Sequence, residues 1–260
     1  VLNAESTLDL LEDDLVIFLS DDSIAQSRPA APDSRRSGKS SAFLSAARHE
    51  NAHYLMLRYR PDLPAEPVRQ RRNWVFLFEC SADRNPLLAR TQIEVVRSIL
   101  NHAEHDDTFA IVTAGPYTHT YAAHSQQATV ENVAQAMTYL DQTHLVGALD
   151  VGQAFGALEP LVEAAENAVV VHVGSGVPVL GEREAGKLVD LLPEDAEYIG
   201  VGVGKRFNRS LMKLAAARTG GYFTELDPDE SVSWRGFQLV STLNTPRLLD
   251  VQVQSDKDGC

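Results

Sequence analysis

The sequence of 260 residues contains only two cysteines, Cys80 and Cys260, which are too few for a disulfide framework. Cys80 follows an apolar run, and we interpret it as a small buried hydrophobe. Basic residues are also scarce, because 23 Lys and Arg face 36 Asp and Glu, for a net charge of -13. That deficit argues against nucleic-acid binding, which needs a basic face for the phosphates. We expect an acidic soluble protein.

Long apolar segments are absent as well. No run approaches the ~20 residues of a membrane span, so we expect no membrane-spanning segment. The chain begins at Val1 with neither an initiator methionine nor a signal-like segment, and we expect a fragment of a longer protein. Its contents of hydrophobic residues, 44%, and charged residues, 23%, are typical of a globular chain.

Apolar residues run without alternation from Val75 to Phe78, which is typical of a strand buried on both faces of a parallel sheet. Two carboxylates and a hydroxyl follow at alternate positions, at Glu79, Ser81 and Asp83. Ligands of open α/β sheets bind at the carboxyl ends of the strands. Oxygen ligands of this kind suit a hard cation such as Mg²⁺, so the stretch predicts a candidate site at this edge.

Strands and helices alternate from Asn73 to Leu243, which predicts an α/β, Rossmann-like, doubly wound and mostly parallel sheet with helices on both faces. We expect Val75–Phe78 at the centre, flanked by Ala110–Val112 and Val169–Val173. Further strands are predicted at Tyr117–Ala123, Tyr198–Val203 and Tyr222–Phe223. Helices are predicted at Leu87–Ala103, Val130–Leu140, Gly147–Ala165, Glu182–Leu192, Phe207–Arg218 and Asp229–Leu243, the third with a bend near Gly156 and Pro160.

The chain outside residues 73–243 is strand-like and lacks helical patterns. Residues 1–72 form a flank and linker with expected strands at Leu15–Leu19 and His53–Tyr59, separated by a mobile loop over residues 21–41. Residues 244–260 contain a last strand and a tail. We expect these flanks to form β structure outside the main sheet.

Several of these segments resemble the von Willebrand factor A (VWA) domain. Glu79–Asp83 is similar to the metal-site pattern Asp-x-Ser-x-Ser of that family, and Asp107–Thr113 is similar to its Asp-x-Phe-x-Leu-Val segment. Ile199–Gly204 and the helix after it resemble the family's Gly-rich strand and following helix. The flanks, at His53–Pro61 and Leu248–Val253, look like the connections in proteins of the inter-α-trypsin-inhibitor heavy-chain type, where a β domain called VIT precedes the A domain. The resemblance implies that residues 1–72 contain at most the last strands of such a domain, not all of it.

The resemblance implies a metal-ion-dependent adhesion site, the MIDAS, built from three loops. Its members by position are Glu79, Ser81 and Asp83 on the first loop, Thr143 on the second and Ser175 on the third. Ser81 and Thr143 would be hydroxyl ligands, Asp83 a direct carboxylate ligand and Glu79 a ligand through water. The third loop of the family supplies an Asp, which Ser175 replaces, so the resemblance implies a degenerate site with weak or absent Mg²⁺ binding.

Without a cation, Glu79 and Asp83 are expected to repel each other unless one takes up a proton or Arg84 neutralises them. The resemblance implies a protein-interaction module, not an enzyme, which binds a protein partner at this edge. It also implies a secreted or cell-surface location. Two alternatives stay open: a Rossmann-like enzyme with Glu79 or Asp83 as general acid or base, and a structural subunit that self-associates.

Other motifs are interpreted as structural. Gly200-Val-Gly-Val-Gly204 lies within a predicted strand and does not match a dinucleotide fingerprint, so we predict close helix packing on small residues. His172 is interpreted as a hydrogen-bonded core histidine. His102 and His105, which end an exposed helix with no clear third ligand, are interpreted as solvated residues.

Overall fold

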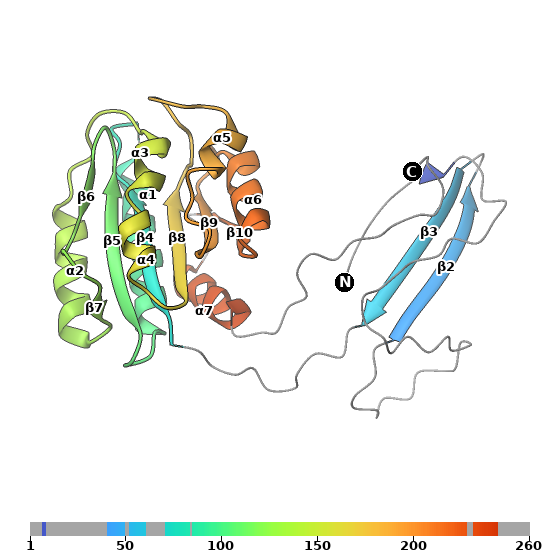
Figure 1. Cartoon of the computed structure of the whole chain (residues 1–260), viewed down its shortest axis with the longest axis horizontal. Coiled ribbons are helices and arrows are strands. Elements are labelled where there is room, and N and C mark those ends of the chain that lie inside the picture. Colours follow the sequence, from blue (N-terminus) through green and yellow to red (C-terminus); the bar gives the residue numbers. More distant parts are fainter. Residues whose placement is uncertain are drawn as a thin grey trace. The chain divides into compact units, whose positions relative to one another are not determined.

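The computed structural model describes residues 7–8, 41–49, 52–60, 71–83, 85–227 and 231–243. The chain divides into two compact units, one of Val68–Thr245 and one of Val1–Pro67 with Pro246–Cys260. The larger unit carries the candidate site residues and is an α/β domain (Figure 1).

The main sheet of the larger unit has seven strands in the order β10-β9-β8-β4-β5-β6, with β7 also paired to β5. All neighbouring pairs from β10 to β5 are parallel, while β6 and β7 run antiparallel to β5. The strands are β4 (Asn73–Glu79), β5 (Thr108–Ala114), β6 (Thr118–Thr120), β7 (Gln126–Gln127), β8 (Ala168–Gly174), β9 (Glu197–Val203) and β10 (Tyr222–Leu226).

Strand β4 lies at the centre of the sheet, as predicted. It pairs with β5 on one side, where Val75 lies opposite Ala110, and with β8 on the other, where Val75 lies opposite Val170. Every residue of β4 is buried, because helices cover both faces of the strand. The uninterrupted apolar run is the sequence signature of this position.

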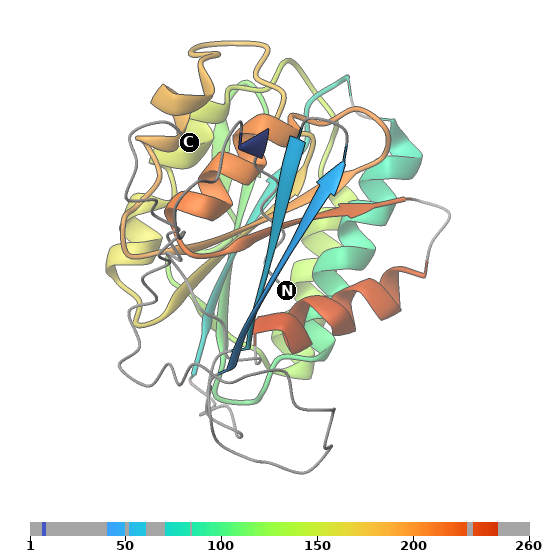
Figure 2. The same ribbon diagram turned by 90° about the vertical axis from the view of Figure 1, so that its right-hand side faces the viewer.

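Two hydrophobic cores lie on the two faces of the sheet. One core joins Trp74, Phe76 and Phe78 of β4 to helices α1, α2 and α7. The other joins Val75 and Leu77 to helices α3, α4, α5 and α6. Helix α7 packs beside α1 (Figure 2). The helices are α1 (Pro86–Asn101), α2 (Val130–Gln142), α3 (Val151–Gly156), α4 (Glu159–Glu163), α5 (Ala185–Val189), α6 (Arg209–Arg218) and α7 (Val232–Leu243).

The helix starts follow from capping side chains. Asn85, Thr129, Asp150 and Asn208 each accept a hydrogen bond from a backbone N–H of the first turn that they precede. The cap at Thr129 was predicted. The single helix predicted over Gly147–Ala165 is wrong, because Asp150 caps a later start and the chain breaks into α3 and α4. The break falls where a bend was predicted, near Gly156 and Pro160. Helix α5 is also shorter than predicted, and β7 was missed.

Small residues in β9 let helix α6 approach the sheet closely. A Cβ added to Gly200 would lie 2.9 Å from Cβ of Met212, and one added to Gly202 would lie 2.9 Å from the ring of Phe207. The Gly-rich strand is therefore explained by packing, as predicted. None of the helices in the described part of the chain combines the length and apolar character that a membrane crossing requires.

The smaller unit is described only in part, as a three-stranded antiparallel sheet. Its strands are β1 (Thr7–Leu8), β2 (Ser41–His49) and β3 (Ala52–Arg60). Strand β3 was predicted, but β2 was not, because its Ser and Ala residues blur the alternation. The strand predicted at Leu15–Leu19 and the last strand after Pro246 lie outside the described residues. So does the mobile loop predicted over residues 21–41, except for Ser41, which begins β2.

Amide hydrogen exchange should be slowest in three segments, Val75–Phe78, Ala110–Val112 and Val169–Val173. These segments are the buried centre of the sheet, and their amides open only with global unfolding. Exchange followed by mass spectrometry or NMR measures this directly. Fast exchange at Val75–Phe78 would contradict the central place of β4.

Candidate functional site

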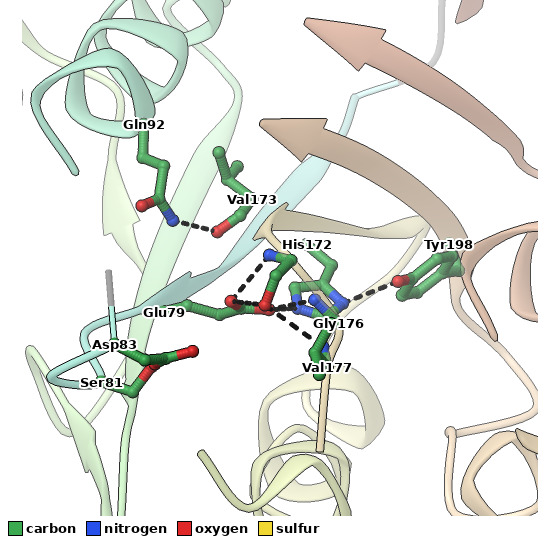
Figure 3. A network of polar contacts seen from close by, with 10 residues as sticks. Glu79, Ser81, Asp83, Gln92, His172, Val173, Gly176, Val177 and Tyr198 are labelled. Atoms are coloured by element: carbon green, nitrogen blue, oxygen red, sulfur yellow. Dashed lines mark hydrogen bonds and ion pairs between the residues drawn. The ribbon is translucent and has the colours of Figure 1, made fainter. Parts of the chain in front are cut away.

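The side chain of Glu79, the last residue of β4, is enclosed by the loop that follows β8. Its exposed fraction is 0%. Both carboxylate oxygens accept hydrogen bonds: Oε1 from the N–H of Gly176 at 2.5 Å, and Oε2 from the N–H and the hydroxyl of Ser175 at 2.7 and 2.8 Å. Figure 3 shows the carboxylate turned toward this loop. The carboxylate therefore acts as an internal clamp on the β8–α5 loop.

His172 of β8 completes this arrangement. Its Nε2 lies 2.8 Å from Oε1 of Glu79, and its Nδ1 lies 2.7 Å from the hydroxyl of Tyr198 in β9. An ionised carboxylate only accepts hydrogen bonds, so Nε2 carries a proton. The other ring nitrogen, Nδ1, makes the hydrogen bond with the hydroxyl of Tyr198. We call the group Glu79, His172, Ser175, Gly176 and Tyr198 the Glu79 network.

Two glycines make room for the Glu79 network. A Cβ added to Gly174 would lie only 2.2 Å from Cδ of Glu79, so the carboxylate occupies the space that a side chain at position 174 would fill. Gly176 adopts φ 60°, in the left-handed region that glycine enters at little cost. This conformation turns the N–H groups of Ser175 and Gly176 toward the same anion, as in an anion-binding nest.

The charge of Glu79 affects the pKa of two neighbouring side chains, Tyr198 and Cys80. Burial, and then the nearby Glu79 carboxylate, raises the pKa of the Tyr198 hydroxyl well above its ordinary value. The same two causes raise the pKa of the Cys80 thiol to about 11. Cys80 therefore stays a protonated, buried side chain at neutral pH, which fits its interpretation as a small hydrophobe.

Ser81 and Asp83 form a separate pair. The hydroxyl of the buried Ser81 donates to Oδ1 of Asp83, whose side chain is exposed. Figure 3 shows the Asp83 carboxylate beside Ser81, while that of Glu79 points to the β8 loop. The carboxylate of Glu79 is thus stabilised by donors of the Glu79 network, and that of Asp83 by the hydroxyl of Ser81. Arg84, expected as a neutralising base, lies outside the described residues.

Thr143 ends helix α2 and bonds within that helix. Its hydroxyl donates to the carbonyl of Tyr139 at 2.9 Å. No hydrogen bond between described residues joins it to Ser81, Asp83 or the Glu79 network. The loop after it does reach the site, because the N–H of Val146 donates to the carbonyl of Cys80 and the N–H of Ala82 donates to the carbonyl of Gly147.

The donor set, as folded, does not fit a divalent cation. The oxygens of Glu79, the hydroxyl of Ser175 and the hydroxyl of Thr143 are all engaged within the domain. Of the two candidate carboxylates, only that of Asp83 is exposed. Across the described residues, no group of three or more His, Cys, Asp or Glu side chains converges as metal ligands would. Mg²⁺ demands a near-octahedral oxygen shell, which these side chains do not form.

Comparison with known proteins identifies the fold. No protein-family model and no curated protein matches the chain. A von Willebrand factor type A protein from Catenulispora acidiphila is similar in structure, with 11% identity and a TM-score of 0.59 over 81% of this chain and 51% of that one. BatB from Bacteroides thetaiotaomicron is similar too, with 12% identity and a TM-score of 0.52 over 67% of this chain and 98% of that one.

A third similar structure is proximal thread matrix protein 1 from the mussel byssus, with 17% identity and a TM-score of 0.53 over 67% of this chain and 46% of that one. Another structure of that mussel protein has a zinc-occupied MIDAS motif. The chain spans about half the length of the Catenulispora and mussel chains. Together these similarities show that the α/β domain has the VWA fold.

The substitution Gly174→Ala tests the Glu79 clamp. The added Cβ would displace the carboxylate, overpack the site and leave buried donors unsatisfied. The free energy of unfolding should therefore be at least about 2 kcal/mol lower than that of the wild type. Urea unfolding measures this difference. Gly186→Ala in helix α5 is the matched control, since no atom lies within 4 Å of the new Cβ. Equal stability of the Gly174→Ala variant and the wild type would show that Glu79 is not fixed in the domain.

Proposed function

We propose that the α/β domain is a protein-interaction module that binds a protein partner at the carboxyl edge of its sheet, near Ser81, Asp83, Thr143 and Ser175. It acts as a binding domain rather than an enzyme. The proposal extends to this chain the role that its resemblance to the VWA family implies. The observation that carries it is the apolar character of this edge.

Exposed apolar side chains gather on the loops of this edge. Tyr117 is 71% exposed on the β5–β6 turn, and Val146 is 54% exposed on the loop before α3. Backbone hydrogen bonds join the loop before α3 to the site, from Val146 to Cys80, and to the segment after β8, from Val179 to Leu149. Three more exposed side chains follow β8, at Val177, Val179 and Leu180. A partner that covered them would gain roughly 25 cal/mol for each Å² of apolar surface removed from water.

The Glu79 network argues against catalysis by Glu79. A general acid or base must reach the proton that it transfers, whereas Glu79 is fully buried and both of its oxygens are hydrogen-bonded inside the domain. Asp83 is exposed, but its carboxylate accepts a hydrogen bond from the hydroxyl of Ser81, and no base or nucleophile contacts it among the described residues. Binding is therefore the better account of this edge.

The β2–β3 hairpin supports the proposal that the protein is of the inter-α-trypsin-inhibitor heavy-chain type, in which a VIT domain accompanies the VWA domain. It places an antiparallel pair before the α/β domain, where that type of protein has its β domain. With this assignment, a secreted or cell-surface location remains part of the proposal.

Site-specific photo-cross-linking tests the proposed surface. A benzoylphenylalanine at Val146 or Val177 should give an adduct with the same partner in extracts of the native source, and excess unlabelled protein should compete it away. Asp195 is the control, because it is exposed and precedes β9 at the opposite edge. An adduct of two copies would favour the self-associating subunit. Adducts formed equally from position 195 would contradict a binding surface at the carboxyl edge.

We also propose that this module depends weakly or not at all on divalent cations. Calorimetric titration with Mg²⁺ and Mn²⁺ should show no dissociation constant tighter than about 1 mM, because the donors are engaged elsewhere and Mg²⁺ requires strict geometry. A micromolar constant that is lost in Asp83→Ala but kept in Asp195→Ala would overturn this expectation and restore a metal-dependent site.

A further inference from the structure

The loop between β9 and α6, residues 204–208, carries two adjacent cations, Lys205 and Arg206, at the carboxyl edge of the sheet. Both side chains are exposed. Within the described part of the chain, neither makes an ion pair or a hydrogen bond through its side chain. This contrasts with Arg209, which pairs with Glu225, and Arg218, which pairs with Asp190. The two cations are therefore available to a ligand.

Contacts at both ends of this loop place it beside the site. At its start, Gly204 has φ 86°, and a Cβ there would lie 2.9 Å from Cδ1 of Leu88 in the first turn of α1. At its end, the N–H of Asn208 donates to the carbonyl of Ser175 at 2.6 Å. Lys205 and Arg206 thus span the stretch from the start of α1 to the loop that encloses Glu79.

Exposed apolar side chains lie close in sequence to Leu88 and Ser175, the residues that contact the two ends of this loop. Leu87, adjacent to Leu88 in α1, is 66% exposed. Val177, whose N–H donates to the hydroxyl of Ser175, is 38% exposed. The first turn of α1 contains no acidic residue, so no side chain of that turn neutralises its positive dipole end. Lys205, Arg206, Leu87 and Val177 form what we call the cationic-apolar patch.

We propose that the cationic-apolar patch binds a carboxylate of the protein partner together with an adjacent apolar side chain. This inference rests on the proposed function and specifies the partner's chemistry. Arg206 can pair with a carboxylate in two parallel hydrogen bonds, and Lys205 adds a point charge. The net charge of -13 repels an acidic segment from most of the surface, so these two cations also direct where it docks. The carboxylate is recognised by side chains, without a metal ion.

A peptide titration followed by NMR tests this proposal. The ¹⁵N-labelled full chain, in EDTA, is titrated with the blocked peptide acetyl-Leu-Asp-Leu-amide and, separately, with acetyl-Leu-Asn-Leu-amide. The aspartyl peptide should shift the amides of Leu87, Ser175–Val177 and Lys205–Asn208, with a dissociation constant on the order of 1 mM, as expected for one exposed ion pair with small apolar contacts. The asparaginyl peptide should bind about fivefold more weakly, which is the upper range for the loss of one exposed ion pair.

Single charge reversals provide the matched comparison. Lys205→Glu and Arg206→Glu should each weaken binding of the aspartyl peptide about fivefold or more, because each replaces an attraction by a repulsion. Lys213→Glu makes the same charge change at an exposed position of α6 and should alter the constant by less than about twofold. The amide spectrum of each variant confirms that it is folded.

Three results would overturn the proposal. The first is equal binding of the two peptides, and the second is equal binding by the wild type and the two loop variants. The third is inorganic phosphate shifting the loop amides when neither peptide does, which would make the loop a site for small anions. If photo-adducts at positions 146 and 177 survive in Lys205→Glu and Arg206→Glu, the interaction module stands and only its carboxylate specificity fails.

Discussion

The buried carboxylate of Glu79 is the interaction on which the rest of the site depends. Removing such a charge from water costs several kcal/mol unless polar partners surround it. Here two backbone N–H groups, one hydroxyl and one imidazole provide those partners, and hydrogen bonds to a charged group each contribute about 1.5–3 kcal/mol. Neighbouring sequence choices follow from this need: Gly174 leaves space, Gly176 turns the loop, and His172 links the carboxylate to Tyr198.

The same interaction changes what the carboxyl edge presents to a partner. A carboxylate that faced outward could hold a cation, whereas one that faces inward closes the β8–α5 loop. The exposed side chains of this edge include Asp83, a set of apolar residues and the two cations of the β9–α6 loop. In the proposed module, affinity then comes from apolar contact and side-chain charge, so it does not vary with the concentration of divalent ions.

The sequence predicts the fold better than it predicts the site. Unbroken apolar runs identify β4, β5 and β8, because a strand that is buried on both faces has apolar residues at successive positions. The order of strands and helices along the chain then indicates a parallel α/β sheet. The grouping of Glu79 with Ser175 was predicted by position in the family. The prediction of His172 as a hydrogen-bonded core histidine is confirmed. Its partners could not be predicted, because they depend on the register between strands, in which Leu77 lies opposite His172 and both share a face with Glu79. The direction of the Glu79 side chain depends on Gly174, whose missing Cβ has meaning only once that register is known.

The pairing of β4 with β8 acquires a fixed alignment from this one polar contact. Both strands are almost uniformly apolar, so sliding one past the other by one or two residues would still bury hydrophobic side chains. A slip of one residue would turn Glu79 to the opposite face, and a slip of two would separate it from the donors of Ser175 and Gly176. Either error leaves a charge buried without partners. The Glu79 network thus penalises misaligned sheets during folding and selects a single native pairing from several that hydrophobicity alone would tolerate.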